Sequence, residues 1–387
     1  MSIIGKSIVL IVAAFFLLMG AGPSGAAVNI QCGDPGNPND KCMSLGGGDG
    51  FITMGDGKVL YIFGFSDLAG STDPLVDGML AAEFTGPTIV VDEGDELYLN
   101  LTNIGLVMRP DLFDPHSVHW HGFPQASNIF DGEPHGTIGI NMGSTLTYYY
   151  NMVEPGTYMY HCHVEATEHM EMGMLANLYM RPKQNKTGCV SGACPPQTLP
   201  KGYAYNDNDG STYYDVEFPI QMGGMDGYFH EQHLAVQPLP FHLLHVTYPV
   251  LNGRGYPDTV NPNPLTAPAE NGGIQSQKVS SLITASAGQK VLLRISNLNV
   301  IQDFTLATVG IPMKVVGRDA RLLRGPDGKD LSYITNSILI GSGETADAIL
   351  DTAGVTPGTY FLYTTNLNFL SNDQEDFGGM MTEIRIN

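Results

Sequence analysis

The chain has 387 residues, of which 43% are hydrophobic and 15% charged, and its formal net charge is −21. So large an apolar fraction excludes a generally disordered chain. Nucleic-acid binding is also excluded, because a phosphate backbone requires a cationic surface and no basic run is present. The length suits two domains of ordinary size. Abundant glycine (47) and proline (25) are typical of many short strands joined by turns.

The first 27 residues predict a signal peptide. Lys6 supplies the positive start, residues 8–19 form the apolar run, and small residues at Gly25 and Ala27 favour cleavage before Val28. The apolar run is short for a bilayer span. We therefore expect an exported mature protein, periplasmic or extracellular, with no membrane span.

Five cysteines are an odd number for an exported chain. Their close spacings favour two disulfides, Cys32–Cys42 and Cys189–Cys194, although other connectivities remain open. Cys162 is then left unpaired between two histidines. A bound metal is the best available reason for a free thiol to persist in an oxidising compartment.

In chain order, residues 28–50 are a Cys/Gly-rich segment, and residues 51–182 follow as a run of predicted strands at 58–65, 87–103, 117–123, 144–152, 156–164 and 174–180. Such short strands separated by turn residues are typical of a β-sandwich. The composition of residues 183–212 predicts a linker. Residues 213–387 repeat the plan of the first half, so we expect an all-β protein with two tandem Greek-key β-sandwich domains.

The repeat lacks the histidines of the first half. The positions that correspond to the first-half ligand candidates hold Gln302, Thr305, Ala307, Tyr363, Thr364 and Thr365. The second domain is therefore predicted to keep the scaffold without the metal chemistry.

Strand parity divides the candidate ligands of the first half, because alternate side chains of a strand point to opposite faces. In the triplet 161–163, the cysteine takes one face and the two histidines take the other. The same alternation separates His116 from the two histidines that follow it. Two metal sites follow, one with His116 and Cys162, and the other with His119, His121, His161 and His163.

The loop after the triplet completes the first site with His169 and Met174. Two imidazoles, one thiolate and a weak thioether are the ligand set of type 1 (blue) copper. Zinc is disfavoured, since it prefers four equal ligands and the usual Cys spacing is absent. Met170 and Met172 are rival axial ligands, which we expect to fill the core instead.

These motifs carry a resemblance to a known family. In the stretches GPTIVVDEGDELYLNLTN, HSVHWHG, DGEP, PGTYMYHCH and HVEATEHMEMGM the chain resembles the multicopper oxidase family, closely over residues 83–182 and more loosely over 213–387. The resemblance implies cupredoxin-like domains and an oxidoreductase that passes electrons through type 1 copper to O2. It also implies type 2 copper at His119 and the catalytic type 3 pair at His121, His161 and His163.

The chain departs from the family pattern in two ways. Five residues (VEATE) separate His163 from the next histidine, an interval that looks like a branch that includes bacterial metal-oxidising members. A full trinuclear cluster needs more histidines than the first half offers, and two-domain members complete theirs across a trimer. We therefore expect a homo-oligomer, with a trimer favoured, although the remaining histidines match no family motif: His230, His233, His242 and His245.

Two other classes stay open. The spacing of His116 and His121 also resembles copper nitrite reductases, which need only two coppers. A plain electron-transfer cupredoxin would use type 1 copper alone. The electron donor is left open among phenols, Cu(I), Mn(II), Fe(II) and a redox protein. Further candidates are His135 at the copper entrance and four carboxylates as proton relays: Asp114, Asp131, Glu165 and Glu168.

Overall fold

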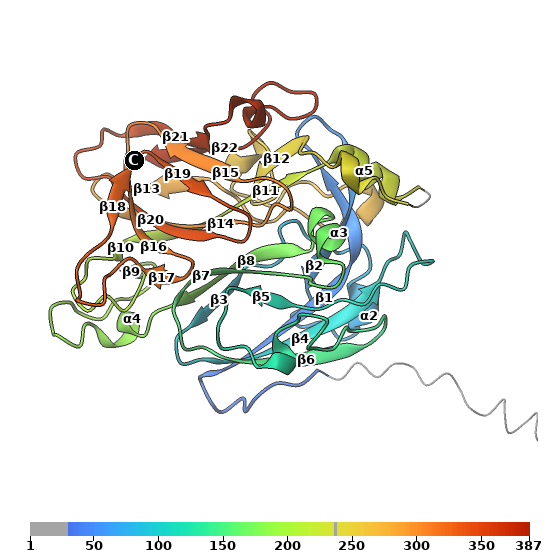
Figure 1. The fold of residues 1–387 in the computed structure, drawn as a ribbon, viewed down its shortest axis with the longest axis horizontal. Coiled ribbons are helices and arrows are strands. Elements are labelled where there is room, and N and C mark those ends of the chain that lie inside the picture. The colour runs from blue at the N-terminus through green and yellow to red at the C-terminus, as the bar shows by residue number, and fades with distance from the viewer. Residues whose placement is uncertain (1–29, 236–237) are drawn as a thin grey trace, which may run out of the picture.

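A computed structural model describes residues 30–235 and 238–387, so the predicted signal peptide lies outside the described residues. The described chain folds into two β-sandwiches joined side by side (Figure 1), which confirms the predicted all-β architecture. In the described part of the chain, no helix is long and apolar enough to cross a membrane.

The first sandwich contains two four-stranded sheets. One sheet has the order β2-β1-β4-β6, with strands Val59–Asp67, Asp40–Thr53, Glu96–Gly105 and Thr145–Asn151. The other has the order β3-β8-β7-β5, with strands Ile89–Asp92, Leu175–Arg181, Gly156–His161 and His119–His121. Alternate residues of both sheets, among them Leu99, Trp120, Tyr148 and Tyr160, enclose the core between them.

The second sandwich repeats this plan with longer sheets. Its first sheet runs β12-β11-β14-β20-β16-β17, with β18 also paired to β16: Tyr248–Leu251, Val216–Met225, Lys290–Asn297, Thr345–Asp351, Met313–Arg318, Arg321–Leu322 and Tyr333–Thr335. Its second sheet runs β13-β22-β21-β15-β19: Ile283–Ala285, Met381–Ile386, Gly358–Thr364, Phe304–Thr308 and Ser337–Ile340. As in the first half, a strand near the middle of the repeat (β15) pairs with the strand of the Gly-Thr-Tyr motif (β21).

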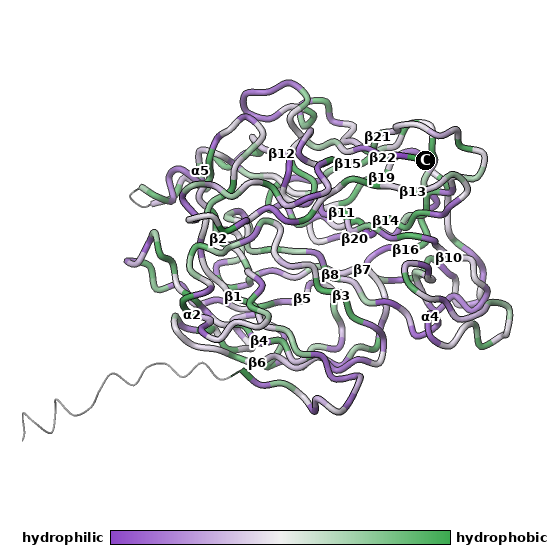
Figure 2. Tube along the Cα trace, turned by 180° about the vertical axis from the view of Figure 1, so that it is seen from behind, coloured by the Kyte–Doolittle hydropathy of each residue, from purple (hydrophilic) through white to green (hydrophobic). Residues whose placement is uncertain are grey.

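Helices are short and lie in the connections. The α-helices of the described residues are α2 (Pro74–Asp77), α3 (Ala166–Glu171), α4 (Gln184–Thr187) and α5 (Gly227–His233). The tube view in Figure 2 shows apolar residues concentrated along the strands and polar residues in many of the outer loops.

Strand β1 corrects the expected domain boundary at residue 50. It starts at Asp40, inside the segment expected to precede the sandwich, and pairs with β2 and β4. The run Gly46–Gly47–Gly48 has poor strand propensity, which is why the sequence pattern did not predict a strand here. The glycines are required by close neighbours, because a Cβ on Gly46 would lie 2.6 Å from the hydroxyl of Ser66.

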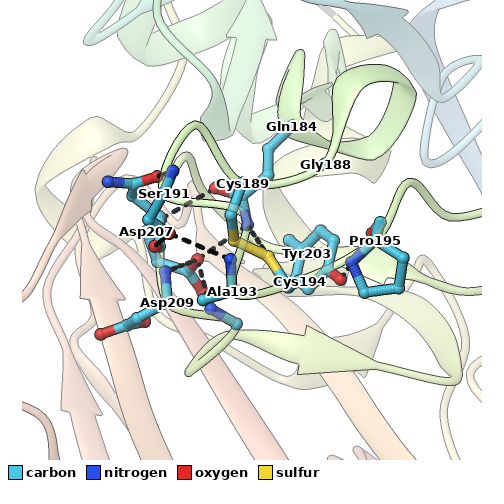
Figure 3. The surroundings of a disulfide bond; sticks show 12 residues. Gln184, Gly188, Cys189, Ser191, Ala193, Cys194, Pro195, Tyr203, Asp207 and Asp209 are labelled. Carbon is cyan, nitrogen blue, oxygen red and sulfur yellow. Dashed lines mark hydrogen bonds between the residues drawn. A yellow bond between two sulfur atoms is a disulfide. The ribbon is translucent and has the colours of Figure 1, made fainter.

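The predicted linker is an ordered part of the molecule. It contains α4, the short strand β9 (Gly202–Tyr203), which pairs with β10 (Tyr213–Tyr214), and the Cys189–Cys194 disulfide, while Cys32 and Cys42 form a second disulfide. Figure 3 shows Asp207 beside the Cys189–Cys194 disulfide. The carboxylate of Asp207 accepts hydrogen bonds from Gln184 Nε2 (2.7 Å) and the Thr212 amide (2.6 Å). Side-chain hydrogen bonds of this kind replace regular backbone pairing in a polar segment.

The two sandwiches meet along a seam between β7–β8 of the first and β11, β14 and β20 of the second. An apolar cluster crosses it, including Phe84, Met159, Met225 and Tyr248. A buried ion network lies beside it: Arg181 pairs with Glu217 and Arg294 with Glu217 and Asp347. This seam fixes where the second half approaches the metal-binding face of the first.

Candidate metal centres

The first cluster gathers His116, Cys162 and His169 in the core of the first sandwich. His116 forms a two-way backbone bridge with Ile140, Cys162 directly follows β7, and His169 lies in α3. One ligand atom from each of the three residues lies within 4.8 Å of the others, and Cys162 Sγ is 3.2 Å from His169 Nδ1. The side chains that strand parity assigned to one site therefore converge.

Met174 closes the same loop. Its amide donates to His169 O (2.8 Å) and its carbonyl accepts from the Cys162 amide (3.1 Å), and its side chain is fully buried. Gly47 of β1 lies against the side chains of His116 and Met174. A Cβ at Gly47 would be 3.0 Å from His116 Cδ2 and 3.4 Å from Met174 Cε. The rival Met170 instead packs against the apolar cluster at the seam.

The first cluster fits a soft transition metal. Both ring nitrogens of His116 are buried without a hydrogen-bond partner among the described residues, which is costly unless they serve another ligand. Burial alone would raise the pKa of the Cys162 thiol, but His169 and His116 outweigh it and hold the pKa well below the ordinary value. A thiolate and two imidazoles, closed from water, are suited to copper.

The second cluster lies on the opposite face of the sheet, as predicted. His119 and His161 lie opposite each other in the β5–β7 pair. His121 Nδ1 lies 3.3 Å from His161 Nε2, and one ligand atom each of His119, His121 and His161 falls within 4.8 Å of the others. The ring of His163 lies close by, with its centroid 4.9 Å from that of His119.

Backbone carbonyls orient the second cluster. His119 Nδ1 lies 2.6 Å from Asp131 O and His161 Nδ1 lies 2.9 Å from Cys162 O, so each Nδ1–H can donate outward and leave Nε2 free for a metal. Burial lowers the pKa of His119 and His121, and it lowers that of His161 to about 3. These histidines are therefore neutral at pH 7, the form that binds metal.

Ser117 connects the two clusters, and the sequence pattern gave no signal for it beyond its place next to His116. Its amide points at Cys162 Sγ (3.5 Å) and its hydroxyl accepts from the His163 amide (3.2 Å). The residue thus fixes the segment that carries His116 and His119 against the segment that carries Cys162 and His163.

The second half contributes no histidine to the second cluster. The ring of His121 lies against Gly343 across the seam, where a cavity of about 130 Å³ is lined by His121, Thr157, Asp319, Gly343 and Thr345 among others. Every histidine of the chain is among the described residues, and His230 and His233 are buried beside α3 instead. His242 and His245 are exposed on the same segment. The histidines present here fit one copper but not a complete trinuclear cluster.

The candidate proton-relay carboxylates and His135 lie in different parts of the first sandwich. The carboxylate of Asp131 lies 3.7 Å from His119 Nδ1, beside the second cluster. Asp114 approaches His169 Nε2 (3.8 Å), while Glu168 pairs with His233, so both lie on the side of the first cluster. Glu165 is exposed next to them, and His135 is 95% exposed, with only Glu133 as a hydrogen-bond partner.

The tandem cupredoxin sandwiches and the buried His–Cys–His cluster define a cupredoxin-fold copper protein. Two family models, both described as multicopper oxidase, match residues 77–185 and 244–384 and together cover more than half of the chain. The chain belongs to the multicopper oxidase family, and this membership implies copper as the metal.

Relatives and solved structures agree with this family. Laccase-11 of Arabidopsis thaliana is 26% identical over 74% of this chain and 42% of its own length. Multicopper oxidase MCE of Talaromyces pinophilus is 35% identical over 27% of this chain and 16% of its own length. The chain thus spans less than half of these relatives. A blue copper oxidase from Nitrosomonas europaea has the same fold, with a TM-score of 0.63 and 22% identity over 89% of this chain and 86% of its own. So does a copper nitrite reductase from that organism, with a TM-score of 0.57 and 17% identity over 89% and 93%.

Proposed function

We propose that the chain is an exported copper-dependent oxidoreductase of the multicopper oxidase type, periplasmic or extracellular, that passes electrons from a donor to O2. The observation that carries the proposal is the placement of Cys162 between His161 and His163, with its sulfur in one cluster and their rings at the other. Type 1 copper would be held by His116, Cys162, His169 and Met174, and the acceptor-side copper by His119, His121, His161 and His163.

Bound copper supplies one-electron redox chemistry at both clusters. The chain supplies the route between them: from Cys162 Sγ through its own backbone to His161, and through the hydrogen bond between Cys162 O and His161 Nδ1 (2.9 Å). A buried Cys162 and a buried His116 keep water away from the first cluster. The rigid β5–β7 pair fixes the second cluster relative to it.

Reduction of O2 consumes protons, which a carboxylate near the second cluster would deliver. Of the four predicted candidates, Asp131 lies beside His119, which supports this role for its carboxylate. Asp114 is placed instead beside His169, the donor side of the first cluster. That side carries carboxylates suited to a metal-ion donor, and a phenol or redox protein is an alternative donor.

A second candidate function is favoured by the histidine count at the seam. Three imidazoles of one chain, His119, His121 and His161, suffice for a single acceptor-side copper, and the second half brings none to this place. This arrangement suits a two-copper enzyme of the nitrite reductase type. In a homotrimer that completes a larger cluster, the neighbour could offer only its exposed histidines, which are His135, His242 and His245.

Substitution of Cys162 tests the proposed route. We expect Cys162→Ser to abolish the blue absorption and the turnover with O2 while copper remains on the second cluster and the fold is unchanged by circular dichroism. Blue absorption that survives the substitution would refute the type 1 assignment. Turnover of the unmodified protein with nitrite but not with O2 would replace the oxidase by the second candidate.

A further inference from the structure

The copper-binding loop, residues 162–174, carries three of the proposed type 1 ligands and little regular structure. Its only helix is α3, which holds His169. Within the first half, its backbone is tied to β2 by the bond from the Phe63 amide to Met172 O (2.9 Å). The last residue of α3, Glu171, is buried against another part of the chain.

That part is α5 of the second half, which lies beside α3 where the two sandwiches meet (Figure 1). Its N-cap residue, Asp226, donates from its amide to Glu171 Oε1 (2.7 Å). One turn later, the buried ring of His230 lies between two backbone carbonyls, Glu171 O (3.1 Å) and Tyr61 O (2.6 Å). The last residue of α3 is therefore held from two points of α5.

His233 makes the contact closest to a copper ligand. Its Nε2 lies 2.7 Å from Oε1 of Glu168, the residue that directly precedes His169. Its ring packs on Phe63 (centroids 4.7 Å apart), and Phe63 in turn packs on the ring of His169 (5.5 Å). Its backbone carbonyl accepts from Arg109, so the end of α5 is also fixed to the first sandwich. Buried and held at both ring and backbone, His233 is not available to a neighbouring subunit.

We propose that His233 is a positioning residue for the type 1 copper, through which the copper-free second half holds α3 and the His169 ring in place. This inference rests on the proposed function, because it assumes copper at the first cluster. The reason is geometric: Glu168 and Phe63 both adjoin His169, and both are fixed by one ring. Contacts outside the ligand shell orient ligands, and their loss typically costs roughly 10–100-fold in metal affinity.

The experiment compares copper retention of the full chain and three variants in competition with a chelator, followed by the blue absorption. We expect His233→Ala to lose type 1 copper about 10–100-fold more readily and to change the electron paramagnetic resonance signal of the copper that remains. His233→Gln, whose side-chain amide can donate to Glu168, should recover most of both readouts. The control is Glu231→Gln, which changes an exposed side chain of the same helix α5 and should match the unmodified protein.

A His233→Ala variant with unmodified copper retention and spectrum would overturn the inference, as would a His233→Gln variant no better than alanine. If His233→Ala fails to fold, His233→Gln decides. A folded His233→Gln variant with copper retention and a spectrum close to those of the unmodified protein supports the inference. A folded His233→Gln variant that loses its copper contradicts the rescue by the amide and overturns the inference. Absence of blue copper in the unmodified protein would instead refute the proposed function itself, so the two failures are distinguishable.

Discussion

Replacing Glu217 by glutamine tests the ion network that joins the two sandwiches. Glu217 contacts Arg294 (2.8 Å) and Arg181 (2.6 Å), and the Arg294 side chain is 0% exposed. After Glu217→Gln, Asp347 (3.4 Å) is the one charged partner left to Arg294, beside the uncharged contacts with Thr157 (3.4 Å) and the Tyr179 ring (4.8 Å to the centroid). Removing one partner of a buried pair costs about 3–5 kcal/mol, and we expect about 3 because Asp347 remains.

The measurement is urea unfolding of the copper-free protein, which avoids stabilisation by bound metal. The matched control is Glu231→Gln, the same exchange in the exposed pair Lys58–Glu231, whose side chains are 30% and 53% exposed. The control should cost less than about 1 kcal/mol. An equal, small effect of both substitutions would refute the view that a buried charge is left uncompensated.

The pH dependence of this effect has a definite sign. Burial raises the pKa of Glu217, but Arg294 and Arg181 outweigh it and hold the pKa below the ordinary 4.5. The stabilisation is therefore present above pH 4.5 and is lost as the pH falls through the lowered value. The difference between Glu217→Gln and the unmodified protein should therefore shrink as the pH falls below 4.5 and through the lowered pKa of Glu217.

Two further predictions concern the clusters. Gly47→Ala would place a Cβ 3.0 Å from His116 Cδ2 and should therefore weaken copper binding and shift the blue absorption. Gly223→Ala, whose Cβ would meet nothing nearer than 3.6 Å, is the control and should leave both unchanged. Equal spectra for the two variants would contradict the close approach of Gly47 to His116. Burial lowers the pKa of His161 from 6.5 to about 3. The copper-free protein should therefore lose unfolding free energy as the pH falls from 6.5, by up to about 5 kcal/mol. His161→Gln should remove this part of the acid sensitivity, and an unchanged pH profile would contradict it.

Local rules were enough to predict the division of the ligands. Alternation along β5 and β7 separates Cys162 from His161 because a strand's period is fixed at two residues. The glycine run of β1 was missed, since the need for Gly47 comes from His116, far away in sequence. The contact of His233 with Glu168 could not be predicted either, because it joins residues 65 positions apart in different sandwiches. Such packing has no periodic signal in the sequence.

The count of copper ions per chain tests the central claim most directly. Elemental analysis of fully loaded protein, combined with electron paramagnetic resonance, should find one type 1 copper and additional copper held by His119, His121 and His161. The resonance of Cys162→Ser should then keep the second signal and lose the first. A single copper per chain in the fully loaded protein, or none with a type 1 signal, would contradict an oxidoreductase built on two copper clusters.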